Sequence, residues 1–126
     1  MTQEDKELLL KDLCARLPYG VKIQVPYDIC SGYYTETVWT IDNDKPFYVN
    51  GRGIEYIKPY LFPLSSMTEE QREEYCSLQQ KVIYNNKGLV NSDTMEYVNW
   101  CYKNHIDINN LIPMGLAIDA TGLNIY

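Results

Sequence analysis

The sequence predicts a single α+β domain over residues 1–126, because three kinds of local pattern follow one another along it. Helical periodicity comes first, a stretch rich in β-branched and aromatic residues follows, and helical patterns return from Thr68. Hydrophobic residues make up 45% of the chain and charged residues 22%, which is typical of a globular domain and not of a disordered one. No internal repeat, low-complexity tract or linker divides the sequence.

The first expected element is a helix over residues 3–16. Five residues recur at helical spacing and form one apolar stripe: Leu9, Leu10, Leu13, Cys14 and Leu17. Thr2 can cap the first turn, and Pro18 followed by Gly20 ends the helix.

A small antiparallel meander of about four strands is expected next. Residues 21–25 alternate apolar and polar side chains and stop at Pro26, and residues 33–41 carry the strongest strand pattern in the chain. In that second segment Tyr33 and Trp39 fall on one face, whereas Tyr34 falls on the other. The meander can stay open or curl into a small SH3-like barrel.

The second half of the meander is expected to contain a hairpin. Asn50-Gly51 is the preferred pair for a type I′ turn, and it would join a short strand at 46–49 to a return strand at 54–57. A phosphate-binding loop is excluded there, because no helix follows the glycines. Pro59 and Pro63 argue against a central strand after the hairpin.

Two C-terminal helices and an irregular tail complete the prediction. Thr68 and Gln71 form a capping box at the start of a helix that reaches about residue 83, and an Asn-rich break follows at 85–88. Asp93 with Glu96 indicates a second helix over residues 93–104. The remaining residues, 106–126, are expected to lie across the core as loops and short extended pieces.

The net charge of −6 makes nucleic acid an unexpected partner. The chain carries 11 basic and 17 acidic side chains and no basic stripe, so little phosphate neutralisation is available. The densest acidic group is Glu69, Glu70, Glu73 and Glu74, which the helical period places on a solvated face rather than in a cation site.

The cysteines and the start of the chain favour a cytoplasmic protein that does not enter a membrane. Four cysteines occur without a CxxC pair, so no zinc knuckle or disulfide-exchange motif is expected, and reduced thiols suit a cytoplasm. The first residues are acidic rather than basic and then apolar, unlike a signal peptide. The longest fully apolar run, Leu8–Leu10, is too short to cross a bilayer.

Three blocks of the sequence, Leu10–Val21, Ile57–Glu70 and Trp100–Asp119, resemble a family of short uncharacterised proteins of Bacteroides-type gut bacteria and their phages and mobile elements. The resemblance implies an accessory or host-interaction role and no particular activity. Relatives often place two adjacent histidines where this chain has Asn104-His105, and an arginine where it has Phe62. A site built on the histidine pair or on that arginine is therefore not expected here.

Cys101 and His105 are the candidates for both a catalytic site and a metal site. Four residues apart on one helix, they would share a face, so a thiolate with an imidazole base is a remote possibility for an enzyme. The negative end of the helix dipole disfavours the thiolate, and His105 fits better as a cation at the helix end. With Asp107, the pair offers at most three metal ligands, so neither a metal nor another cofactor is expected.

A surplus of tyrosine is the one positive indication of function. The chain has 12 tyrosines but only 2 phenylalanines and 2 tryptophans. Six aromatic residues of the meander form the candidate binding surface: Tyr33, Tyr34, Trp39, Tyr48, Tyr56 and Tyr60. A small sheet cannot bury aromatics on both faces unless helices cover both, so some of these rings are expected to be exposed for recognition.

The leading hypothesis is therefore a non-enzymatic module that binds another protein through this aromatic surface. The alternative is a small-molecule site, such as a nucleotide stacked between tyrosines, which requires a concave, aromatic-lined pocket. The sequence specifies neither the ligand nor the oligomeric state.

Overall fold

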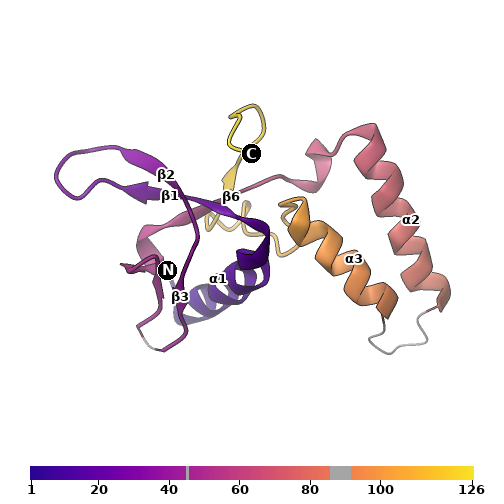
Figure 1. Ribbon diagram of the computed structural model, residues 1–126, viewed down its shortest axis with the longest axis horizontal. Helices are drawn as coiled ribbons and strands as arrows, with labels where there is room; N and C mark the ends of the chain where they lie inside the picture. The colour runs from indigo at the N-terminus through magenta and orange to yellow at the C-terminus, as the bar shows by residue number, and fades with distance from the viewer. Residues whose placement is uncertain (45, 86–91) are drawn as a thin grey trace.

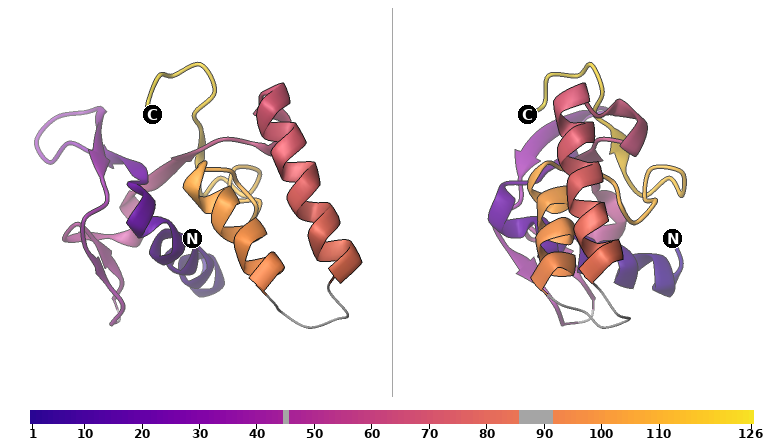
Figure 2. Two further views of the ribbon diagram at one scale, coloured as in Figure 1. Left: turned by 45° about the vertical axis from the view of Figure 1, so that its right-hand side comes forward. Right: turned by 90° about the vertical axis from the view of Figure 1, so that its right-hand side faces the viewer.

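The computed structural model describes residues 1–44, 46–85 and 92–126 and confirms the α+β class. The described residues form three α-helices, α1 (Gln3–Arg16), α2 (Glu69–Asn85) and α3 (Ser92–Lys103). Helices α2 and α3 lie side by side at one end of the molecule, the β1–β2 hairpin projects at the opposite end, and α1 lies between them (Figures 1 and 2). None of the described helices combines the length and the apolar character needed to cross a membrane.

The larger sheet has the strand order β2-β1-β6-β7. Its strands are β1 (Lys22–Pro26), β2 (Tyr33–Thr37), β6 (Lys58–Leu61) and β7 (Ile118–Asp119). The first three strands are antiparallel, whereas β7, from the tail, joins β6 in parallel. The two sheets stay open, so the SH3-like barrel does not form.

The smaller sheet contains β3 (Ile41–Asp42), β4 (Tyr48–Val49) and β5 (Arg52–Gly53). The predicted turn is present between β4 and β5, where Asn50 and Gly51 have positive φ angles of 52° and 81°. The predicted strand 33–41 is interrupted between β2 and β3. There the side-chain oxygen of Asn50 accepts hydrogen bonds from the backbone N–H groups of Trp39 and Thr40, at 2.8 and 3.2 Å.

Two strand predictions around residue 57 are wrong. A short 3₁₀ helix, Ile54–Tyr56, replaces the expected return strand. The strand β6, which contains Pro59, then lies between β1 and β7 rather than being excluded from the sheet. Pro59 is tolerated because its register partner is Ile23, whose own hydrogen bonds point toward β2, so the β1–β6 ladder needs no N–H from the proline.

The predicted capping of α1 and α2 is confirmed. Thr2 and Asp5 form a reciprocal capping box at α1. At α2, the backbone N–H of Gln71 donates to the Thr68 hydroxyl and the N–H of Thr68 donates to the Gln71 amide oxygen. The break at 86–88 and the side chain of Asp93 lie outside the described residues.

The main core lies between α1 and the two sheets. It includes Leu9, Leu13, Val21, Ile23, Val25, Val49, Ile54, Ile57, Leu61 and Leu111. A second cluster, built on Met67, Cys101 and Ile106, joins α3 to the segment before α2. Two further 3₁₀ turns, Leu17–Tyr19 and Leu64–Ser66, connect these elements.

The buried face of α1 differs from the predicted stripe. Cys14 is exposed, and Asp12 and Arg16 are fully buried beside Leu9 and Leu13. The apolar period alone could not predict that a charged pair occupies this face.

Candidate functional site

Exposed aromatic residues do occur on the meander, as the tyrosine surplus predicts. Four of the six candidates have exposed side chains: Tyr33, Trp39, Tyr48 and Tyr56. Tyr34 is half-buried, and Tyr60 is buried, so the expectation of exposure is wrong for Tyr60. The tail reaches β6, where the Tyr126 hydroxyl donates to the backbone oxygen of Tyr60 at 2.7 Å.

Tyr33 and Tyr56 are brought together on the outer face of the larger sheet. Tyr33 is 61% exposed and Tyr56 65% exposed, although both line one groove. The groove has a volume of about 250 Å³ and is lined by Gln24, Pro26, Tyr33, Glu55, Tyr56 and Lys58. Antiparallel pairing places Pro26 directly opposite Tyr33, which fixes that ring beside the apolar proline. We call this groove the Tyr33–Tyr56 groove.

Tyr34 points to the other side of β2 and helps to hold the β1–β2 hairpin. Arg52 donates to its hydroxyl at 2.9 Å and to the carboxylate of Asp28 at 2.7 Å. This guanidinium lowers the pKa of Asp28. The ring of Tyr27 packs on Tyr34 with a centroid separation of 5.2 Å. Tyr34 thus has a structural role, in positioning the hairpin from which Tyr33 projects.

Trp39 and Tyr48 are exposed at two other places. Trp39 follows the far end of β2, where its indole N–H donates to the Glu36 carboxylate at 3.3 Å. Tyr48 lines a separate depression of about 270 Å³ with Thr40 and Asp42. The six candidates therefore do not form one continuous surface.

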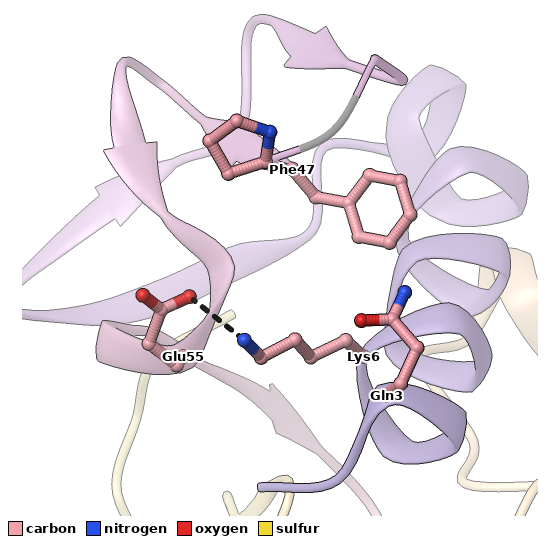
Figure 3. A pocket seen from close by; sticks show the side chains of 5 residues that line it. Gln3, Lys6, Phe47 and Glu55 are labelled. Carbon is pink, nitrogen blue, oxygen red and sulfur yellow. Dashed lines mark ion pairs between the residues drawn. The ribbon is translucent and has the colours of Figure 1, made fainter.

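Two other pockets do not have the features of a stacked-nucleotide site. The pocket beside α1 in Figure 3, of about 340 Å³, contains Phe47 as its single aromatic lining residue. Lys6 and Glu55 lie across it as an ion pair at 4.0 Å. The groove between α2 and α3, of about 390 Å³, is lined by Trp100 and by carboxylates that include Glu74, which accepts the indole N–H. Carboxylates would repel a phosphate.

Contrary to the prediction, Cys101 and His105 do not share one helix face. Helix α3 ends at Lys103, and His105 adopts a left-handed conformation with φ of 60°. Its N–H donates to the Tyr102 oxygen and the N–H of Ile106 donates to the Cys101 oxygen, which is a Schellman termination of the helix. Burial raises the pKa of the Cys101 thiol to about 11, so the thiol is protonated at neutral pH.

His105 is neutral rather than a cation at the helix end. Its ring stacks on Tyr126 with centroids 3.7 Å apart. Burial, together with the charges of Arg16 and Lys22, lowers the pKa of His105 to about 4. Its Nδ1 atom is buried and has no hydrogen-bond partner in the described part of the chain. The prediction of a C-terminal cation is therefore wrong, because desolvation outweighs the helix dipole.

This low pKa predicts a loss of stability in mild acid. His105 is the only histidine. A histidine in an unfolded chain has a pKa of about 6.5, so the unfolded protein binds a proton at His105 below that pH. The folded protein binds this proton only below about pH 4. The free energy of unfolding should therefore fall as the pH drops from about 6.5 to about 4.

Urea midpoints at pH 7 and pH 5 measure this loss of stability. The variant His105→Asn retains a residue that tolerates the left-handed conformation but cannot titrate, so its midpoint should change less between the two pH values. Equal changes in the two proteins would refute the assignment.

The charged network around Arg16 was not predicted. Arg16 donates to both Asp12 carboxylate oxygens, at 2.6 and 3.2 Å, and to the backbone oxygen of Ile106 at 2.7 Å. Its guanidinium carbon lies 4.8 Å from the centroid of the Tyr102 ring. Asn109 donates to Asp12 at 2.8 Å. The network ties α1 to the end of α3, and its ion pair of Asp12 and Arg16 is fully buried, so we assign it a structural role.

Acidic residues and cysteines are not gathered into a metal site in the described part of the chain. Glu69, Glu70, Glu73 and Glu74 are all exposed, as predicted for a solvated helix face. Among the described residues, no three His, Cys, Asp or Glu side chains lie close enough to hold a metal ion.

Comparison with known proteins adds no family. No protein-family model matches the chain, and no curated protein and no solved structure is significantly similar to it.

Proposed function

We propose that this protein is a non-enzymatic module that binds another protein through the Tyr33–Tyr56 groove. The observation that carries the proposal is the pair of tyrosines, each more than half exposed, beside Pro26 in one groove on a rigid sheet. Tyrosine supplies a large contact area with little conformational entropy to lose, which is why it is enriched at protein interfaces.

The rim of the groove supports a partner with an extended or flat surface. Lys58 and Glu55 provide one charge of each sign beside the rings. This combination of an aromatic centre and a mixed polar rim is typical of protein recognition, in which the centre carries most of the binding energy. The volume of about 250 Å³ falls below the range of about 300–1,000 Å³ typical of small-molecule sites, which favours a protein over the nucleotide alternative.

A cytoplasmic location belongs to the same proposal. It rests on four cysteines that are all free thiols, three of them exposed. The resemblance to proteins of Bacteroides-type bacteria and their mobile elements supports a host protein as the partner.

Affinity capture from a bacterial lysate, followed by a titration with each purified captured protein, tests the proposal. The double variant Tyr33→Ala/Tyr56→Ala should weaken binding of the partner at least about tenfold, because each interface tyrosine typically contributes more than about 1 kcal/mol. Tyr48→Ala is the matched control, an exposed tyrosine on the separate depression. Unchanged affinity in the double variant, or equal loss in the control, would refute this assignment of the surface.

A further inference from the structure

One edge of the larger sheet is open. Strand β2 ends the sheet and pairs with β1 alone among the described residues. Backbone hydrogen bonds from Tyr27 to Gly32 and from Val38 to Val21 lie at the two ends of the β1–β2 ladder. They determine which residues of β2 form hydrogen bonds to β1 and which do not. Even-numbered residues of β2 therefore bond to β1. The odd-numbered residues Tyr33, Thr35 and Thr37 turn their backbone N–H and C=O groups outward.

Strand β2 lacks the usual features that protect an edge strand against pairing. Natural edge strands usually carry lysine, proline or a bulge, and Tyr33–Thr37 has none of these. Tyrosine and threonine favour strands, and they make up every position except Glu36. The oxygen of Thr37 accepts from the Asn50 side chain at 3.0 Å, so this end of the edge is partly capped. The outward backbone N–H and C=O groups of Tyr33 and Thr35 are the ones that remain open for pairing.

We infer that a second copy of this chain pairs antiparallel with β2, so that the two larger sheets become one. The register follows from the open groups. When Tyr33 lies opposite Thr35 of the second copy, and Thr35 opposite its Tyr33, both residue pairs exchange both of their backbone hydrogen bonds. The Thr37 oxygen keeps its bond to Asn50. A two-fold axis then passes between the two copies of Tyr34, which form a non-hydrogen-bonded pair.

The side chains are compatible with a second copy in this register. Counting outward from the axis, Glu36 lies opposite Gly32 of the second copy, so no like charges face each other.

The hairpin geometry leaves room for the pairing. The hairpin of β1 and β2 projects from the body of the molecule, with Ile29 in the loop between the strands (Figures 1 and 2). Pairing through the edge also leaves the Tyr33–Tyr56 groove on the outer face of the sheet. The dimer therefore shares the strand position of Tyr33 with the proposed groove, whereas Tyr56 belongs to the groove alone.

Sedimentation velocity over a concentration series tests the dimer. The wild-type mass should rise from 14.7 kDa toward twice that value with concentration. Thr35→Pro should stay at 14.7 kDa, because it removes an outward N–H that the monomer does not use. Thr35→Val keeps that N–H and should dimerise as the wild type does. A wild type that remains monomeric at millimolar concentration would overturn the inference.

Disulfide trapping tests the register and does not depend on the proline variant folding. In a background with Cys14, Cys30 and Cys76 changed to serine, Tyr34→Cys should crosslink two chains on oxidation. Non-hydrogen-bonded pairs place their Cα atoms about 4.5 Å apart, within disulfide range. Thr35→Cys should not crosslink. The reverse pattern, or no crosslink from either variant, would overturn the pairing.

The two proposals fail separately in these assays. Tyr56→Ala should weaken partner binding without changing the sedimentation behaviour, and Thr35→Pro should abolish the dimer while the groove side chains remain. A loss of partner binding without loss of the dimer therefore tests the groove, and a loss of the dimer without loss of partner binding tests the pairing of the β2 edge.

Discussion

Replacing Asp12 with alanine is expected to lower the free energy of unfolding by about 3–5 kcal/mol, as removal of one partner from a buried ion pair typically does. Arg16 would remain fully buried without its carboxylate. One of its nitrogens, Nη1, already lacks a hydrogen-bond partner among the described residues. Urea denaturation followed by circular dichroism measures the loss.

The exposed pair of Asp28 and Arg52 provides a matched control for Asp12→Ala. Both pairs join an aspartate to an arginine, and their shortest nitrogen–oxygen distances are 2.7 Å for Asp28–Arg52 and 2.6 Å for Asp12–Arg16. The Asp28 side chain, however, is 75% exposed. Asp28→Ala should hardly move the midpoint, because water solvates the freed guanidinium. The double variant Asp12→Leu/Arg16→Met should recover much of the stability, since no charge is then left buried. Equal losses for Asp12→Ala and Asp28→Ala would contradict the explanation.

Replacing Asp107 with alanine should cost about 2–4 kcal/mol, since hydrogen bonds to a charged group contribute about 1.5–3 kcal/mol each and lost bonds are partly compensated. Asp107 is buried, and its two carboxylate oxygens accept from the backbone N–H groups of Leu111 and Ile112, both at 2.9 Å. These bonds hold the turn that carries Leu111 into the core. The measurement is again the urea midpoint and slope.

Asp119→Ala is the control for Asp107→Ala, because it removes similar hydrogen bonds from an exposed carboxylate instead of a buried one. Asp119 also accepts a backbone N–H, from Thr121 at 2.9 Å, and a hydroxyl from the same residue. Its side chain is exposed, so water can replace the carboxylate and the loss should be much smaller. A loss at Asp119 as large as that at Asp107 would show that burial is not the deciding factor.

Local signals predicted the helices well and the sheet poorly. Helix α1 begins and ends where its cap and Pro18 indicate, and the capping box at Thr68 marks the start of α2. These signals act within a few residues, so the sequence displays them directly. The strand pairing of β6 with β1 and β7 depends instead on contacts across the chain, and Pro59 gave a misleading local indication.

The candidate site was predicted in its residue type but not in its arrangement. Tyrosine surplus correctly indicated exposed rings at Tyr33 and Tyr56. Their meeting in one groove depends on the 3₁₀ turn that precedes β6, which no pattern indicated. Tyr60 is bonded through its backbone to Tyr126, and Arg16 is bonded to the backbone of Ile106, so both positions depend on residues far along the chain. Spacing of four residues between Asp12 and Arg16 indicates an ion pair, although nothing local distinguishes a buried pair from an exposed one.

The bond from Arg16 to Ile106 also has a consequence for synthesis on the ribosome. Its two ends are 90 residues apart, and the bond from Lys22 to Tyr126 spans 104. The first helix therefore leaves the exit tunnel long before the segment that covers it. Until then its leucines and its ion pair lack the later residues that cover them in the folded protein.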